Sequence, residues 1–395
     1  AMASLGGTPS RTRRQAATVP DLEYEFLTQD ALYGQDVGTY LEREGHPLRE
    51  LEPAVRFEKI WPRAPLWKRL AFLLSAPASA AGLAAEYDAI ISGSESLATW
   101  MLLSEAEERG IPSFRVCVSY LESGSLPQGG WRLQLKGAAK TLLSLVPRLS
   151  YLGYAGRPGE APYDRYYVMG DRSRQYLADR GVDRDRIVVS GIPRFRSHFE
   201  RAGTWPTEAL PENRPTLLYI VSAFKTHGRP VLHRRQNEQI RRIVAAADGC
   251  RDPRCRLCIK LHPRGEKADF AWLEDTPAWV TVLDGPVDIF ELFYRSHLLT
   301  SIVSTMSYEA AIVGCPVALS VFPDLLEVRP RAIHGDFPLA ESPEELLDRL
   351  YRLHRDPRGE RCQYPGADEI ADVMHPGTAG AAAAIAGDIA ERARL

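Results

Sequence analysis

Apolar runs alternate with helical patterns along most of the chain. Residues 87–93 form an apolar run that ends in a glycine turn, and residues 94–110 follow as a predicted helix. Another apolar run covers residues 114–121. A strand, a helix and a second strand in succession are typical of an α/β domain with a parallel sheet, whose binding edge is formed by the loops at the carboxyl ends of the strands.

The same alternation recurs in two later parts of the sequence. A helix is expected at residues 171–180, between strands at 166–170 and 185–191. Residues 201–215 are rich in proline and have the composition of a linker. After the linker, strands are predicted at residues 216–222, 256–261, 279–283 and 298–303. The pattern therefore predicts an α/β protein with two Rossmann-like domains.

The expected organisation has five parts. They are a flexible N-terminus at 1–30, a first domain at 31–200, a linker at 201–215, a second domain at 216–370 and a terminal helix at 371–395.

Composition narrows the class of protein. The 395 residues are 45% hydrophobic and 25% charged, which is typical of a soluble globular protein. A net charge of −2 gives no argument for nucleic acid binding. No apolar run approaches the ~20 residues of a membrane span, and residues 1–17 lack the apolar core of a secretory signal. A cytoplasmic protein is expected. The amphipathic residues 65–74 favour a core-facing helix, with contact to the inner membrane surface as the alternative.

Three of the six cysteines are close in sequence. Cys250, Cys255 and Cys258 have a spacing that could serve a metal or a cluster. The chain supplies no fourth local ligand unless His262 joins them. A Cys250–Cys255 bridge or free thiols are therefore favoured, and no metal site is predicted.

A group of hydroxyl residues marks the start of one predicted helix. Ser304, Thr305 and Ser307 follow an apolar run, and Gly314 supplies the helix stop. Free backbone N–H groups and the helix dipole favour an anion at such a helix start. Glu309, about one turn inside, is placed to accept hydrogen bonds from sugar hydroxyls.

A second group of candidate residues follows neighbouring strands. Pro263 restricts His262 to extended conformations, so the imidazole could donate to a phosphate while Arg264 adds a charge-assisted bond. An isolated His–Pro is more often structural, but its pairing with the hydroxyl group favours a phosphate site. Ser222 and Lys225, in and after the strand at the start of the second domain, are expected to contribute.

A carboxylate is expected at the edge of the first domain. Glu122 lies beside Gly124 after an apolar strand, where it could project between the domains and take a proton from an acceptor hydroxyl. The alternative is a loop glutamate that caps a helix. Asp88, Glu95 and Asp164 are the other carboxylates considered for this role.

Four motifs occur in a fixed order along residues 87–323. They are Glu122-x-Gly124, Gly191-x-Pro193-Arg194, Leu261-His262-Pro263 and the predicted helix with its stop at 304–316. Together they resemble bacterial capsule glycosyltransferases, which include the capsular Kdo transferases and polysialyltransferases, and more distantly the CDP-glycerol glycerophosphotransferases. The resemblance implies the GT-B architecture, in which two Rossmann-like domains face each other. It further implies that the terminal helix at 371–395 returns to the first domain. It also implies a CMP-linked 2-keto acid sugar as donor and inversion without a metal or other cofactor.

The resemblance also assigns roles to residues. It implies Glu122 as the base, and His262 with Pro263 as part of the CMP site. Ser304, with Thr305 or Ser307, completes that site. The acidic motif here has a single carboxylate, which leaves either the base or the subgroup open.

The favoured function is metal-independent inverting transfer of a sugar to a hydroxyl acceptor, such as a glycan or glycoconjugate. Two of the motifs also recur in the superfamily of UDP-N-acetylglucosamine 2-epimerase, so an epimerase is one alternative. A non-catalytic subunit that binds a sugar nucleotide or glycan is the other. The sequence leaves the sugar, the linkage and the oligomeric state open.

Overall fold

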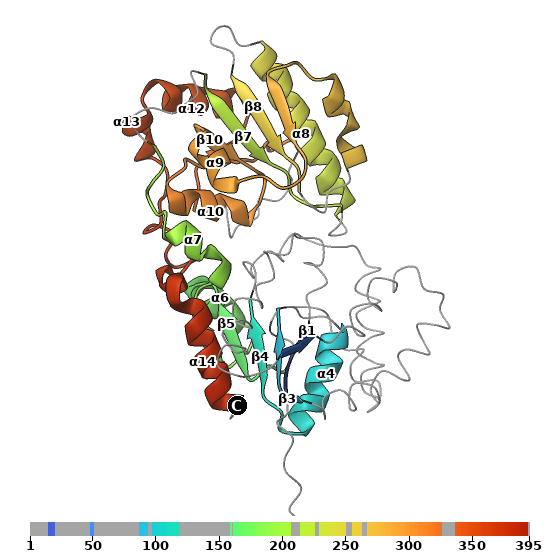
Figure 1. The fold of residues 1–395 in the computed structure, drawn as a ribbon. Coiled ribbons are helices and arrows are strands. Elements are labelled where there is room, and N and C mark those ends of the chain that lie inside the picture. Colours follow the sequence, from blue (N-terminus) through green and yellow to red (C-terminus); the bar gives the residue numbers. More distant parts are fainter. Residues whose placement is uncertain are drawn as a thin grey trace, which may run out of the picture.

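The computed structural model describes residues 15–19, 48–50, 87–93, 97–117, 159, 161–206, 214–225, 229–249, 255–262, 267–325 and 336–393. These residues form two lobes, one above the other in Figure 1, and each lobe is built on a parallel sheet. This arrangement confirms the predicted α/β class with two parallel sheets.

The first lobe contains a six-stranded sheet with the order β2-β1-β3-β4-β5-β6, and each neighbouring pair is parallel. Its strands are β1 (Gln15–Val19), β2 (Leu48–Glu50), β3 (Tyr87–Ser92), β4 (Ser113–Val116), β5 (Arg165–Val168) and β6 (Ile187–Val189). Strand β1 falls within the stretch expected to be a flexible N-terminus, and it pairs with both β2 and β3.

Both faces of the first sheet are covered. Helices α4 (Leu97–Glu108) and α6 (Asp171–Ala178) contribute to the core on one face, where Ile90 and Tyr166 are buried. Helix α14 (Ala381–Ala393) packs on the other face against Ile91 and Phe114 (Figure 1). Burial on both faces explains the near-continuous apolar strands. The C-terminal helix therefore returns to the first lobe, as the resemblance implied.

The second lobe contains a four-stranded parallel sheet with the order β10-β7-β8-β9. Its strands are β7 (Thr216–Ile220), β8 (Arg256–Lys260), β9 (Val280–Leu283) and β10 (Leu298–Thr300). A smaller parallel pair joins β11 (Leu319–Ser320) to β12 (Leu339–Ala340). The helices are α8 (Pro230–Asp248), η5 (Lys267–Asp275), α9 (Ile289–Tyr294), α10 (Thr305–Val313), α12 (Pro343–Arg355) and α13 (Pro357–Arg361).

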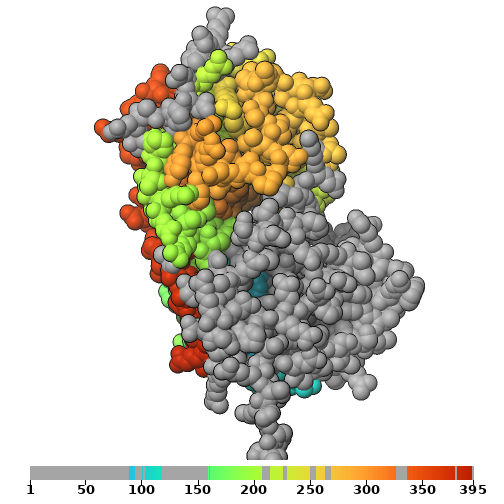
Figure 2. Space-filling model, viewed as in Figure 1, coloured from blue at the N-terminus to red at the C-terminus, as the bar shows by residue number. Residues whose placement is uncertain are grey.

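A connecting segment leads from the first sheet to the second lobe. It follows β6 and contains η4 (Pro193–Phe195) and α7 (Arg196–Phe199), whereas η3 (Arg184–Arg186) lies before β6 within the first lobe. The chain returns later through η6 (Pro376–Gly380). The backbone N–H of Trp205 donates to the Val313 carbonyl at 2.8 Å, and that of Gly203 donates to Ile312 at 3.1 Å. In Figure 2 this green segment lies directly against the orange part of the second lobe. The connecting segment thus contacts helix α10 at its C-terminal end.

Candidate functional site

Several predicted site residues lie at one edge of the second sheet. Ser222 follows β7, His262 follows β8, and Ser304 follows β10. Since β7 lies between β10 and β8 in a parallel sheet, the carboxyl ends of these three strands are neighbours. In open α/β sheets this is the edge at which ligands bind.

The start of α10 has the geometry of a capped helix. Ser304 is extended (φ −159°, ψ 140°), and its Oγ accepts a hydrogen bond from the N–H of Met306 at 3.2 Å. Ser304 and Thr305 are both partly buried. The helix ends at Gly314, whose left-handed φ of 97° favours glycine. The predicted start and stop of this helix are both confirmed.

Ser307 lies on the inner side of the same turn. It is fully buried, and its Oγ lies 3.1 Å from that of Ser301. The hydroxyl is therefore paired inside the lobe. Of the three hydroxyl residues at the helix start, Ser304 and Thr305 are the two that retain exposed surface.

Ser222 holds two loops together. Its Oγ donates to the carbonyl of Val303, directly before Ser304. Its backbone N–H donates to Gln236 Oε1 at 2.8 Å, and Gln236 Nε2 donates to the Ser222 carbonyl at 3.1 Å. Because Gln236 is fully buried, this pair fixes the end of β7 and, through Ser222, the segment that leads into α10.

Lys225 and His262 occupy different environments. Lys225 Nζ lies 2.7 Å from Asp269 Oδ1 on η5, and its side chain is 45% exposed. His262 is partly buried at the end of β8. The other members of its motif, Pro263 and Arg264, lie outside the described residues. Glu122, predicted as the base, also lies outside them.

Glu309 has protein partners at both carboxylate oxygens. Oε1 lies 2.8 Å from Arg194 Nη2, and Oε2 lies 3.2 Å from His198 Nε2. Burial alone would raise the pKa of this carboxyl, but Arg194 and His198 outweigh it and hold the pKa below its ordinary value. Sugar binding by Glu309 stays a prediction. The motif contained Arg194, but no sequence pattern indicated that it would contact Glu309.

A second polar group joins the first lobe to α10. Arg172 on α6 donates to Asp336 Oδ2 at 2.6 Å, and the Tyr308 hydroxyl donates to the same oxygen at 2.8 Å. Arg172 also contacts Asp372 at 2.6 Å. Helix α10 is thus tied to the first lobe by side chains and to the connecting segment by backbone hydrogen bonds.

The structure bears on the cysteine prediction in part. Cys255 and Cys258 are buried, and they belong to hydrophobic clusters on opposite sides of the second sheet. Cys250 lies outside the described residues. Within the part of the chain that the structure describes, no group of three or more His, Cys, Asp or Glu side chains could hold a metal ion.

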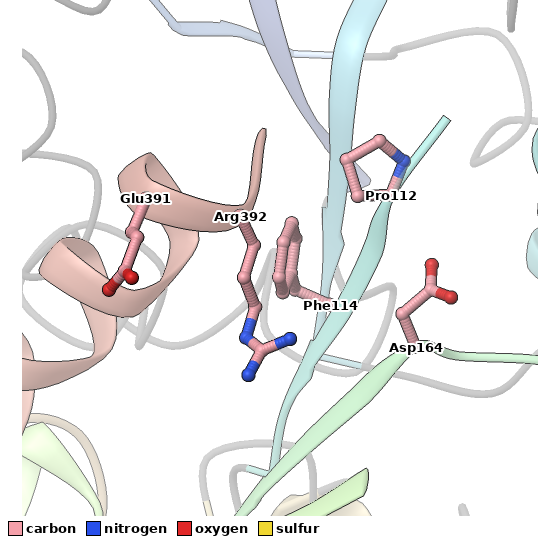
Figure 3. A pocket seen from close by; sticks show the side chains of 5 residues that line it. All are labelled: Pro112, Phe114, Asp164, Glu391 and Arg392. Carbon is pink, nitrogen blue, oxygen red and sulfur yellow. The ribbon is translucent and has the colours of Figure 1, made fainter. Parts of the chain in front are cut away.

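A surface cavity of about 430 Å³ lies at the amino edge of the first sheet, where β4 and β5 begin (Figure 3). Its lining includes Phe114, Asp164 and Arg392. Asp164 Oδ2 accepts hydrogen bonds from the N–H of Ser113 at 2.7 Å and from its hydroxyl at 3.0 Å. Asp164 therefore caps the amino end of β4, on the side of the sheet away from the carboxyl edge, and is poorly placed to be a base there.

No helix in the described ranges is both long enough and apolar enough to cross a membrane. The amphipathic residues 65–74, considered for contact with a membrane surface, lie outside those ranges.

Comparison with known proteins identifies the fold. A scan against protein-family models finds no match, and a comparison with curated proteins finds none. Solved structures do match. The UDP-GlcNAc 2-epimerase from Neisseria meningitidis bound to UDP-GlcNAc has a TM-score of 0.54 at 13% identity, over 95% of this chain and 100% of that one. The S. aureus MnaA–UDP structure has a TM-score of 0.55 at 12% identity, over 97% of each chain.

The structure of a polymerase is similar to this chain to a comparable degree. The wall teichoic acid polymerase TagF has a TM-score of 0.52 at 9% identity, over 96% of this chain and 89% of that one. These identities are too low to carry an activity across. The likeness extends over nearly the whole chain, and the fold is therefore GT-B-like, with two parallel α/β sheets.

Proposed function

We propose that the carboxyl edge of the second sheet binds the phosphate of a nucleotide sugar, and that the protein transfers the sugar to a hydroxyl acceptor with inversion. The observation that carries this proposal is the capped start of α10 after β10, at the same edge of the sheet as the end of β8. Ser304 and Thr305 retain exposed surface at this helix start. His262 follows β8, which is separated from β10 by β7. All three can donate hydrogen bonds to an anion.

The proposed chemistry is stabilisation of a leaving group. As the bond between the sugar and the phosphate breaks, negative charge develops on the phosphate oxygens. Hydroxyl and imidazole donors, together with the N-terminal dipole of α10, are suited to that charge. In this mechanism they act in place of a divalent cation.

The acceptor side of the proposal rests on Glu122. A general base takes the proton of the acceptor hydroxyl while that oxygen attacks the anomeric carbon, and the phosphate leaves from the opposite face. The motif resemblance favours a CMP-linked 2-keto acid sugar as the donor and a glycan or glycoconjugate as the acceptor.

Nucleotide binding tests the proposal directly. Thermal unfolding is measured with CMP, CDP, UDP and GDP, each with EDTA and then with Mg²⁺ or Mn²⁺, because a ligand that binds the folded state raises the unfolding temperature. We expect CMP or CDP to give the largest shift with EDTA present. A shift that requires a divalent cation would contradict the metal-free mechanism, and no shift with any nucleotide would contradict the site.

A 2-epimerase is the second candidate, because a UDP-GlcNAc 2-epimerase is among the proteins of similar fold. The two candidates differ in their need for an acceptor. Incubation with UDP-GlcNAc alone, followed by NMR of the sugar, would reveal epimerisation without an acceptor. Transfer requires one.

A further inference from the structure

A buried lysine lies directly before the histidine of the proposed site. Lys260, the last residue of β8, is only 8% exposed. Its Nζ donates hydrogen bonds to the carbonyl oxygens of Leu261 at 3.0 Å and Gly285 at 2.8 Å. These carbonyls belong to the two chain segments that leave β8 and β9, so one ammonium group joins both.

Burial of this ammonium opposes folding. Lysine is among the residues least often buried, and a charged group taken out of water is destabilising unless it is well paired. Burial lowers the pKa of Lys260, and the nearby Asp284 carboxylate opposes that shift. Cys258, two residues earlier on the same side of the strand, packs in an apolar cluster. An apolar side chain would suit that side of β8, so packing alone does not explain a lysine there.

The hydrogen bonds of Lys260 act on the backbone of its neighbour. The Leu261 carbonyl belongs to the peptide bond between Leu261 and His262, so the ammonium fixes the orientation of that peptide. The N–H of Leu261 donates to the Leu283 carbonyl at 3.0 Å. Gly285, whose carbonyl is the other acceptor of Lys260, has a left-handed φ of 98°. This backbone conformation favours glycine. The chain entering His262 is therefore held from two sides.

We propose that Lys260 is a positioning residue that orients His262 toward the phosphate of the bound nucleotide. This inference rests on the proposed function and goes beyond it, because Lys260 acts through the backbone and does not touch the nucleotide. A rigidly held donor is more effective than a mobile one, since less freedom is lost when the ligand binds.

A double-mutant cycle tests this role. Binding of CMP, with UDP as a second probe, is measured by calorimetry on the full chain for wild type, Lys260→Met, His262→Ala and the double variant. We expect Lys260→Met to weaken binding on the order of tenfold, comparable to losing a hydrogen bond to a charged group. The double variant should bind no more weakly than His262→Ala, because Lys260 then has no histidine to orient.

Two further variants separate positioning from general loss of structure. Lys260→Arg keeps the charge and the donors, and it should retain most of the affinity. Arg242→Met removes a partly exposed cation of α8 that pairs with the exposed Asp324, and it should leave affinity unchanged. The unfolding temperature is recorded for every variant. If Lys260→Met does not fold, the cycle is run with Lys260→Gln, which keeps a polar end.

The outcomes are distinct. Wild-type affinity in Lys260→Met, or effects of Lys260→Met and His262→Ala that simply add, would overturn the positioning role and leave the proposed function standing. Wild-type affinity in His262→Ala would overturn the positioning role and remove His262 from the phosphate site, and the proposed function would be overturned only if Ser304→Ala also bound with wild-type affinity. Weakening by Lys260→Met that disappears in the His262→Ala background, with rescue by Lys260→Arg, would support the proposal.

Discussion

The Glu309 carboxylate of α10 lies 2.8 Å from the Arg194 guanidinium of the connecting segment. Helix α10 also carries Ser304 and Thr305 at its start, so this ion pair links the proposed phosphate site to the segment that joins the lobes. Glu309 is 7% exposed, and a buried charge destabilises the folded state unless it is paired. The position of the helix start is therefore tied to the arrangement of the connecting segment.

Glu309→Gln is expected to destabilise the protein. The substitution keeps the shape of the side chain but leaves Arg194 and His198 without their carboxylate. We expect the free energy of unfolding to fall by about 1–3 kcal/mol, less than for a fully enclosed pair because the Arg194 side chain is 26% exposed. Urea unfolding measures this change. Glu200→Gln, which breaks the exposed pair with Arg196, is the matched control and should change stability by less than about 0.5 kcal/mol.

If His262 and Ser304 both contact the phosphate of the nucleotide, replacing either residue should weaken nucleotide binding. His262→Ala and Ser304→Ala should each reduce the binding free energy by about 1–3 kcal/mol, through loss of a hydrogen bond to phosphate. Calorimetric titration with CMP and UDP measures this loss. Ser342→Ala is a matched control, because Ser342 caps α12 by accepting from the N–H of Glu345 at 3.1 Å. It should lower stability by about 1 kcal/mol and leave affinity unchanged. Wild-type affinity in both test variants would place the donor site elsewhere.

A buried histidine predicts how stability depends on pH. His297 Nδ1 accepts a hydrogen bond from the N–H of Thr216 at 3.1 Å, and its Nε2 lies 3.0 Å from His354 Nδ1. Burial, with a smaller effect of His354, lowers the pKa of His297 from 6.5 to about 4. Because the folded state disfavours the proton, stability is fully present above pH 6.5 and falls as the pH drops toward 4.

The expected loss over that interval is roughly 3 kcal/mol. It is measured by urea unfolding at a series of pH values. His297→Asn can still accept from Thr216 but does not titrate, so its unfolding free energy should change less between pH 6.5 and 4. An unchanged slope in this variant would show that other groups cause the acid sensitivity.

The sequence predicted the fold better than it predicted the contacts within the site. Apolar strands at regular spacing specify the two sheets because both faces are buried, and the hydroxyl and glycine residues around α10 specify its ends through local capping. The Arg194–Glu309 pair joins residues far apart in sequence, and no local pattern encodes it. Buried Lys260 and Gln236 also escaped prediction, since a polar residue in a strand or helix shows its backbone partners only after folding.

The acceptor side of the mechanism rests on Glu122, which follows an apolar strand of the first domain in the sequence. As a general base it should contribute about 10²–10⁴-fold to the rate. Glu122→Gln should therefore reduce transfer by that order while leaving nucleotide affinity close to wild type, because the amide cannot accept the proton but occupies the same volume. Turnover and nucleotide titration on one preparation measure both quantities. Near-normal turnover would remove Glu122 from the mechanism. A loss of nucleotide affinity would instead assign Glu122 to the donor site, and the roles of the two domains would then be exchanged.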